Sequence, residues 1–233
     1  MNQRSAVFRL LVLLAAPAFL VAQSAVPNLS GFWELGFDSR NVPPASLTAT
    51  AAAADRVTQA KHDADAIRWC HFFGVPYVMG QSPIDIVQNT NGKEIAITFP
   101  VRNPGRHIYT DGRQHVNPDV FDPASNGHSI GHWEGDTLVV DSVGFSDEGI
   151  LAIPGGGRRS MTSHLVERYK LLNNGQRLSV LFTWEDPNVF AKPHTYEFRY
   201  YKAPPGTEAR EFDCAASDEE RTKFLTGTPG MAK

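Results

Sequence analysis

Hydrophobic and polar residues alternate along much of the chain between residues 84 and 202, and this period of two is the strongest constraint on the fold. Such alternation is typical of β-strands that bury one face. Turn signals separate the alternating segments: Asn91-Gly92, Asp111-Gly112, Glu134-Gly135-Asp136 and Asn173-Asn174-Gly175. Because Asn-Gly is the strongest short hairpin signal, the sequence predicts consecutive strands joined mostly by tight turns.

The pattern predicts an all-β fold of about nine strands. The expected strands cover residues 31–37, 84–88, 94–99, 106–110, 128–133, 137–143, 163–172, 177–185 and 194–202. Closing such a meander into a barrel removes its exposed edges, so we expect an antiparallel up-and-down β-barrel. A two-sheet β-sandwich is the alternative.

One helix is expected before the strand-rich region. Pro43-Pro44 breaks the chain, and residues 46–69 then read as a helix that begins with a run of alanines. No linker divides the chain after residue 25, so residues 25–233 are expected to form a single domain. This domain ends in a polar tail that starts at Ala203.

The first 24 residues resemble a secretory signal peptide. Arg4 and Arg9 supply the positive region, and an apolar run from Leu10 to Ala22 precedes small residues at Ala22 and Ser24. The run is too short for a membrane-spanning helix, which needs about 20 apolar residues. We therefore expect a protein that is exported to the periplasm or secreted, without stable membrane insertion.

The charge balance excludes some partners. The chain has a formal net charge of −3, and removing Arg4 and Arg9 with the signal peptide makes it more acidic. An acidic chain without a basic cluster is a poor candidate for binding nucleic acid or an anionic membrane surface. A small-molecule ligand or substrate is the expected partner.

The chain has only two cysteines, Cys70 and Cys214. In an oxidising compartment a distant pair most simply forms one disulfide, and two free buried thiols are the alternative. A zinc site is not expected at either cysteine, because no CxxC or CxxH pair is present.

Residues 127–131 read Gly-His-Ser-Ile-Gly, which matches the Gly-x-Ser-x-Gly pattern of serine hydrolases. A nucleophile elbow needs a strand, a sharp turn at the serine and a following helix. Here Ser129 is followed by Glu134-Gly135-Asp136 and the apolar strand Leu138-Val139-Val140, which together predict a hairpin. The hairpin interpretation argues against Ser129 as a nucleophile.

Six of the eight histidines fall in the strand-rich region, which raises the question of a metal site. His128 and His132 share a strand face, but four residues of extended chain separate them by about 13 Å. They cannot both bind one ion while the strand stays extended, so a metal site would need one of them together with residues of neighbouring strands, such as His115, His164 or Glu167. We therefore predict no metal ligands, name no cofactor, and expect these imidazoles on the surface or hydrogen-bonded in a cavity.

Other polar residues are candidates for acid–base chemistry or ligand binding. A buried imidazole or carboxylate can act as a general base, and an arginine can stabilise an anion. The catalytic candidates are His128, His115, Asp111 and Glu167, and the ligand-binding candidates are Arg113, Arg168, Trp133 and Tyr169. The alternative for Glu167 and Arg168 is that both form ordinary ion pairs across strands.

Two resemblances accompany these residues. Gly31-Phe32-Trp33 resembles the Gly-x-Trp of lipocalins and other calycins, whose barrels hold small apolar ligands. Gly127-His128-Ser129, the Trp133–Asp141 segment, Asp111-Gly112-Arg113, Glu167-Arg168-Tyr169 and Asp186-Pro187 resemble a family of uncharacterised exported bacterial proteins. The first resemblance implies a ligand-binding barrel, and the second implies export without an activity.

Two function classes follow. The favoured one is an exported β-barrel that binds a small, largely apolar or aromatic molecule in its cavity, with the many aromatic residues lining the cavity or filling the core. The alternative is an acid–base hydrolase, lyase or isomerase on the same barrel, which requires a histidine and a carboxylate at a cavity wall. The sequence leaves open whether the protein is an enzyme.

Overall fold

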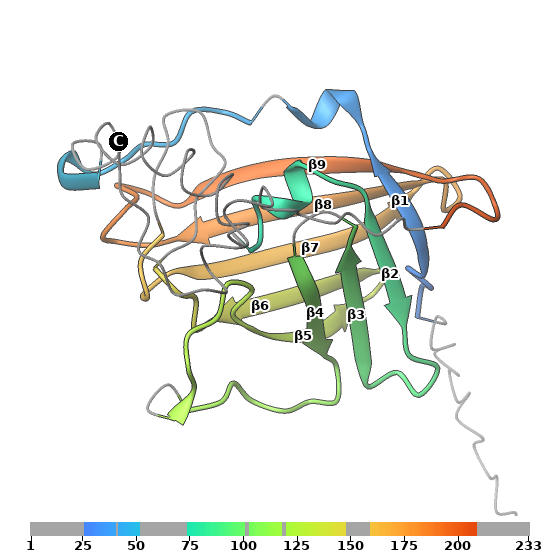
Figure 1. Ribbon diagram of the computed structural model, residues 1–233, viewed down its shortest axis with the longest axis horizontal. Helices are drawn as coiled ribbons and strands as arrows, with labels where there is room; N and C mark the ends of the chain where they lie inside the picture. The colour runs from blue at the N-terminus through green and yellow to red at the C-terminus, as the bar shows by residue number, and fades with distance from the viewer. Residues whose placement is uncertain are drawn as a thin grey trace, which may run out of the picture.

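The computed structural model describes residues 26–40, 42–51, 74–100, 103–117, 120–147 and 159–208. These residues form a closed β-barrel in which the strands follow one another in chain order and β9 pairs with β1 (Figure 1). The strands are β1 (Gly31–Leu35), β2 (Ile84–Gln88), β3 (Glu94–Phe99), β4 (Asn103–Tyr109), β5 (His128–Glu134), β6 (Thr137–Val143), β7 (His164–Leu172), β8 (Arg177–Glu185) and β9 (His194–Lys202). Two short 3-10 helices accompany them, η1 (Phe37–Arg40) and η2 (Val78–Gly80).

The period-two pattern places the core inside this barrel. On β8, the second, fourth, sixth and eighth residues are buried and the intervening ones are not. The turns follow the predicted signals: Asn173 and Asn174 join β7 to β8 with positive φ angles of 51° and 53°, and Gly135 joins β5 to β6 with φ 61°. The predicted nine-strand barrel is confirmed, and its closure excludes the two-sheet sandwich.

The predicted antiparallel order is wrong at one junction, because β4 and β5 run parallel. Strands that reverse direction at every step around a closed ring must be even in number. A ring of nine therefore needs one parallel neighbour pair, and β9 still meets β1 antiparallel. The purely up-and-down, calycin-like arrangement does not hold at β4–β5.

A parallel pair needs a crossover that returns the chain to the end where it started. Residues 110–127 provide it, and we call them the β4–β5 connection; its described part runs along the lower side of the barrel in Figure 1. β4 and β5 themselves share only two residue pairs, Ile108–Ser129 and Tyr109–Ile130. The end of the connection is fixed to the barrel by backbone bonds between Ala124 and the 144–146 segment.

The described residues bear on part of the remaining predictions. Residues 49–51 are helical, and the Thr48 hydroxyl caps this start by accepting the Ala51 N–H at 3.2 Å. The predicted start of this helix at Ser46 is wrong, because residues 46–48 are not helical and Leu47 forms a β-bridge with Phe190. Residues 52–69 of the predicted helix, the signal segment 1–24, Cys70, Cys214 and the end of the polar tail lie outside the described residues. Within the described ranges, no helix has the length and apolar character needed to cross a membrane.

The segment before η2 packs tightly on the end of the β4–β5 connection. Gly74 has φ +68°, and a Cβ at this position would lie 1.7 Å from the Ser125 carbonyl oxygen. The next residue, Val75, donates its N–H to Asn126 Oδ1 at 3.2 Å and accepts a bond from the buried Arg159 at 3.0 Å. Glycine is therefore required at residue 74 by both its backbone angle and the space available.

We expect Gly74→Ala to destabilise the protein by about 1–3 kcal/mol more than Gly112→Ala. Gly112 is the matched control because it also has a positive φ (+82°), while a Cβ there would have no neighbour within 4 Å. The comparison isolates the backbone overlap from the cost of the left-handed conformation. Urea unfolding followed by circular dichroism measures it, and equal midpoints would contradict the packing described for Gly74.

Candidate functional site

A chain of hydrogen-bonded ionisable side chains crosses the outer wall of the barrel. We call it the histidine cluster: it consists of His115, His128, Asp141, His164 and Glu185. Four of its members come from consecutive strands, β5 to β8, and His115 comes from the β4–β5 connection. Their neighbours in sequence point the other way, since Ser129, Ser142, Leu165 and Trp184 are buried in the interior. Strand alternation therefore places the cluster on the outer face.

The hydrogen bonds run in one line. His128 Nδ1 lies 2.8 Å from His115 Nδ1, and His115 Nε2 lies 2.8 Å from Asp141 Oδ1. The other Asp141 oxygen lies 2.9 Å from His164 Nε2, and His164 Nδ1 lies 3.3 Å from Glu185 Oε2. Asp141 thus accepts bonds from two imidazoles at once.

The carboxylates assign the protons along this line. An ionised carboxylate only accepts, so His115 carries its proton on Nε2 and, when neutral, has a bare Nδ1. His128 must then donate from Nδ1, which leaves its Nε2 unprotonated. Nε2 of His128 is the basic atom at this end of the cluster.

Aromatic rings surround His128, which is only 8% exposed. Tyr109 stacks on it with ring centroids 5.7 Å apart, and Phe121 meets it edge-on at 5.8 Å. The Arg113 guanidinium lies 3.8 Å from the centre of the Tyr109 ring and forms an ion pair with Asp111. Tyr109 of β4 and Phe121 and Arg113 of the β4–β5 connection therefore surround His128 with apolar and cationic groups.

These surroundings shift the pKa values of His128 and His164 in opposite directions. Burial lowers the pKa of His128, and the neighbouring His115 and Arg113 lower it further. The bond to Asp141 raises the pKa of His164. The pKa of Asp141 is lowered by its bonds to His164 and His115, and Arg113 lowers the pKa of the exposed Asp111 to about 2. His128 is therefore held neutral where His164 favours its charged form.

A second polar group lies inside the barrel, directly behind the first. We call it the interior cluster: it consists of Arg106, Ser129, Ser142, Glu167 and Tyr169, all at most 2% exposed. Arg106 forms a two-bond ion pair with Glu167, one bond of which is 2.9 Å long, and donates to both serine hydroxyls at 2.8–3.1 Å. The Tyr169 hydroxyl donates to Glu167 at 2.7 Å. Every member has a partner within the cluster.

The interior cluster is charged but internally compensated. Burial alone would lower the pKa of Arg106, but the Glu167 carboxylate outweighs it and the pKa lies above its usual value. Burial and the same carboxylate raise the pKa of Tyr169. Because a buried ion pair loses its hydration, it is tolerated only when its remaining lone pairs and protons are satisfied, as they are here. This arrangement indicates a structural role for Glu167.

We expect Glu167→Gln to destabilise the protein by about 3–5 kcal/mol, because it leaves the Arg106 charge buried without a partner. The matched control is Glu134→Gln, which breaks the Arg168–Glu134 pair on the exposed face of the same wall. The control should leave the unfolding midpoint almost unchanged. Thermal and urea unfolding of both variants test this, and equal effects would contradict the structural role.

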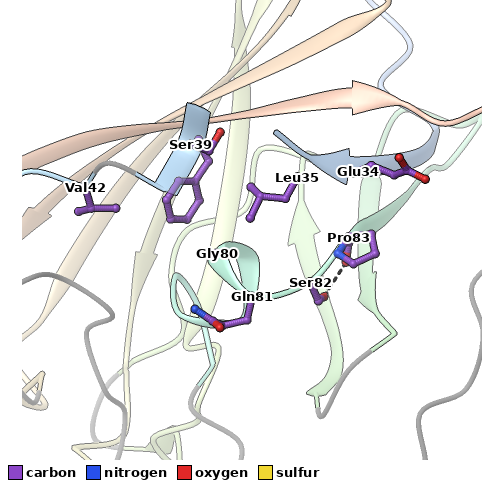
Figure 2. Close-up of a pocket in the computed structure, with 9 residues that line it drawn as sticks. Glu34, Leu35, Ser39, Val42, Gly80, Gln81, Ser82 and Pro83 are labelled. Carbon is purple, nitrogen blue, oxygen red and sulfur yellow. Dashed lines mark hydrogen bonds between the residues drawn. The ribbon is translucent and has the colours of Figure 1, made fainter. Parts of the chain in front are cut away.

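A pocket of about 550 Å³ opens in the barrel wall where β1 leaves β2. The two strands pair only up to Trp33, and beyond it β1 continues along β9 through Leu35. We call the resulting gap the wall pocket; its lining is Glu34, Leu35, Ser39, Val42, Gly80, Gln81, Ser82, Pro83 and Phe198 (Figure 2). In Figure 2, Leu35 extends from β1 toward the η2 turn at Gly80.

The wall pocket combines apolar and polar surfaces. Leu35, Val42, Pro83 and Phe198 supply the apolar part, and Gln81 and Glu34 lie at exposed positions of the lining. The η2 helix separates this pocket from the interior cluster. Its Met79 is fully buried, with its sulfur 3.9 Å from the Tyr169 hydroxyl and its carbonyl bound by Tyr200 at 2.7 Å.

The structure brings four of the predicted residues together and separates the others. His128 and His115 are in direct contact, and Asp111 and Arg113 lie beside them across Tyr109. Glu167 and Tyr169 lie in the interior cluster, on the opposite face of the wall. Arg168 is paired with Glu134 on the surface, and Trp133 lines a smaller pocket of about 280 Å³ at the β2–β3 hairpin. The alternative of ordinary ion pairs thus describes both Glu167 and Arg168.

Sequence reasoning considered His164 only as a possible metal ligand, and it missed Asp141, Arg106 and all of the wall pocket. Asp141 follows three apolar residues of a strand, and His164 opens another strand; their proximity depends on the β6–β7 register. The sequence did contain a signal for Asp141 and His164, since both are polar residues at outward positions of alternating strands. Ser129 lies on a strand of the predicted hairpin, where it is buried and bonded to Arg106 and Ser142, and this environment argues against a nucleophile.

Comparison of the chain with protein-family models and with curated proteins finds no match. Within the described ranges, no group of three histidine, cysteine, aspartate or glutamate side chains has an arrangement that would hold a metal ion. The function must therefore be argued from the geometry of the wall pocket and the two clusters.

Proposed function

We propose that this chain is an exported β-barrel protein that binds a small amphipathic molecule in the wall pocket. The observation that supports binding is the pocket itself, about 550 Å³ in volume and open between β1 and η2. Sites for small molecules in proteins commonly measure about 300–1,000 Å³. Export rests on the signal-like residues at the start of the chain.

The position of the ligand follows from what fills the barrel. Among the described residues, the inward side chains of β1, β8 and β9 form one buried core that includes Trp33, Trp184 and Tyr200. A molecule on the barrel axis would have to displace them. The wall pocket needs no such displacement, because its space already exists between the strands.

The lining defines the chemistry of the ligand. Leu35 and Phe198 offer an apolar surface for a ring or a short hydrocarbon body. Gln81 and Glu34 offer an amide and a carboxylate at the exposed side, which suit a hydrogen-bond donor such as an amine or hydroxyl. We therefore expect a ligand with an apolar body and one polar end that remains close to water.

The acid–base alternative has a specific observation in its favour, the histidine cluster with its unprotonated Nε2 on His128. The burial of His128 argues against this alternative, since Tyr109 and Phe121 cover its ring, which is only 8% exposed. A substrate would need the β4–β5 connection to move before it reached that nitrogen. Binding in the wall pocket requires no movement and remains the proposal.

Filling the wall pocket tests the proposal. We expect the double variant Leu35→Trp/Val42→Trp to weaken binding of the neutral fluorescent amine N-phenyl-1-naphthylamine by about 10-fold or more, because the indoles occupy the space of its rings. The control is Met161→Trp, which adds the same side chain at an exposed position outside the pocket lining. Fluorescence titration measures the Kd.

Equal affinity of the three proteins would contradict binding in the wall pocket. Native mass spectrometry of protein purified from its own export compartment provides the second readout. An organic molecule that co-purifies with the wild-type chain and is lost from the double variant supports the proposal. A molecule retained equally by both proteins places the site elsewhere.

A further inference from the structure

We propose that His115 and His128 form an acid-sensitive latch that holds the β4–β5 connection against the barrel wall. The inference is independent of the wall pocket and rests on the direct contact between two imidazole nitrogens, 2.8 Å apart. One ring belongs to the connection and the other to β5, so the contact joins a crossover to the sheet. We call this pair the latch.

The latch has room for one proton between its two nitrogens. A hydrogen bond between Nδ1 atoms requires one ring to donate and the other to accept. If both rings become imidazolium ions, two N–H groups face each other at 2.8 Å and two positive charges lie with their ring centroids 5.1 Å apart. The bond is then replaced by repulsion, and the contact is lost.

A single added proton does not break the latch. Asp141 lies 2.8 Å from Nε2 of His115 and stabilises a positive charge on that ring. His115 can then donate from Nδ1 to His128, which reverses the bond without breaking it. The second proton, on His128, opens the latch, and burial together with Arg113 opposes this proton in the latched state.

The surrounding ionisable groups act on the two rings unequally. On the barrel side, Asp141 contacts His115, and His164 and Glu185 continue the chain of bonds away from it. On the connection side, Arg113 forms an ion pair with Asp111 and still disfavours a positive charge on His128. Tyr109 faces His128 from β4 with its ring, and no described carboxylate bonds to His128 directly. Asp141 thus stabilises the latch at His115, whereas a second proton on His128 has no described carboxylate to stabilise it.

The sign of the pH dependence follows from linkage. When the connection is released, His128 meets water and binds a proton near the ordinary histidine pKa of about 6.5. The latched state holds one proton fewer below that pH, so acidification favours release. The latch is fully present above about pH 6.5 and is lost as the pH falls through the depressed pKa of His128.

The two halves of the connection depend on the latch differently. The later half is held by backbone bonds, because Ala124 donates to the Gly144 carbonyl at 3.1 Å and accepts from Ser146 at 3.0 Å. The earlier half reaches β5 and β6 through the side chain of His115. Release should therefore affect residues 111–117 first and leave residues 124–127 in place.

Amide hydrogen exchange of the full exported chain, followed by mass spectrometry, tests the latch. After correction for the intrinsic pH dependence of exchange, we expect protection of residues 111–117 to fall by about 10-fold or more between about pH 7.5 and pH 5 in the wild type. Residues 124–127 serve as an internal reference and should keep their protection. An unchanged 111–117 segment would overturn the proposal.

The decisive variant is His128→Asn, with His132→Asn as its matched control. Asparagine places an amide near the position of Nδ1 and can either donate or accept, so it should bond to neutral and to charged His115 alike. Protection of residues 111–117 should then become independent of pH in His128→Asn. His132 lies on the same strand but is exposed and paired with Glu134, so His132→Asn should behave like the wild type.

Histidine ¹⁵N chemical shifts of the wild-type protein keep the test independent of how the variants fold. At about pH 7.5 one Nδ1 of the pair should be protonated and the other bare. A fall in the protection of residues 111–117 that accompanies protonation of the second ring supports the latch. Two fully protonated rings with the segment still protected would overturn it.

Discussion

Nine strands cannot close into a ring in which every neighbour runs antiparallel, and this constraint organises the molecule. One pair has to be parallel, and the chain uses β4 and β5 for it, joined by only two residue pairs. A parallel pair in turn requires a long return path, which residues 110–127 supply on the outside of the barrel. The parallel junction of the barrel thus also places the connection, with His115, against His128.

The wall next to this junction is polar on both faces. On β5 the outward His128 and the inward Ser129 are neighbours in sequence, and they belong to the histidine cluster and the interior cluster respectively. Inside, the charge of Arg106 is balanced by Glu167; outside, Tyr109 of β4 and Phe121 of the connection shield His128 from water. Because successive side chains of a strand point to opposite faces, His128 lies in the outer cluster while the next residue, Ser129, contacts the Arg106–Glu167 ion pair inside.

The wall pocket arises from a second departure from regular pairing. β1 leaves β2 after Trp33 but stays with β9, and η2 fills the space only in part. Gly80 is necessary for this geometry, because a Cβ there would lie 2.9 Å from the Phe198 ring. The close fit of η2 beneath the pocket keeps Met79 buried over the interior cluster.

Much of the fold was predictable from the sequence, because alternation and turn residues are local properties. The segment around Asn173-Asn174-Gly175 specifies a hairpin whatever the rest of the chain does. The direction of β5 relative to β4 was not predictable in this way. Alternation determines which face a residue occupies, but a long connection allows either direction.

The residues of the candidate site also differ in how far the sequence could predict their positions. Asp111, Arg113 and His115 are close in sequence, so their common location was accessible to sequence reasoning. Asp141 and His164 reach the same place only through strand register, which depends on the closed barrel. The sequence offered an ion pair as one interpretation of Glu167, but its partner Arg106 lies three strands away around the ring.

The parallel junction is the claim on which the rest depends, and backbone nuclear Overhauser contacts test it most directly. The account predicts the parallel pattern between Ile108–Tyr109 and Ser129–Ile130, together with close Hα–Hα contacts typical of antiparallel pairing between β1 and β9. An antiparallel pattern at β4–β5, or a parallel one at β1–β9, would contradict it. An antiparallel β4–β5 pair would also remove the crossover that brings His115 to His128, and the histidine cluster would lose its structural basis.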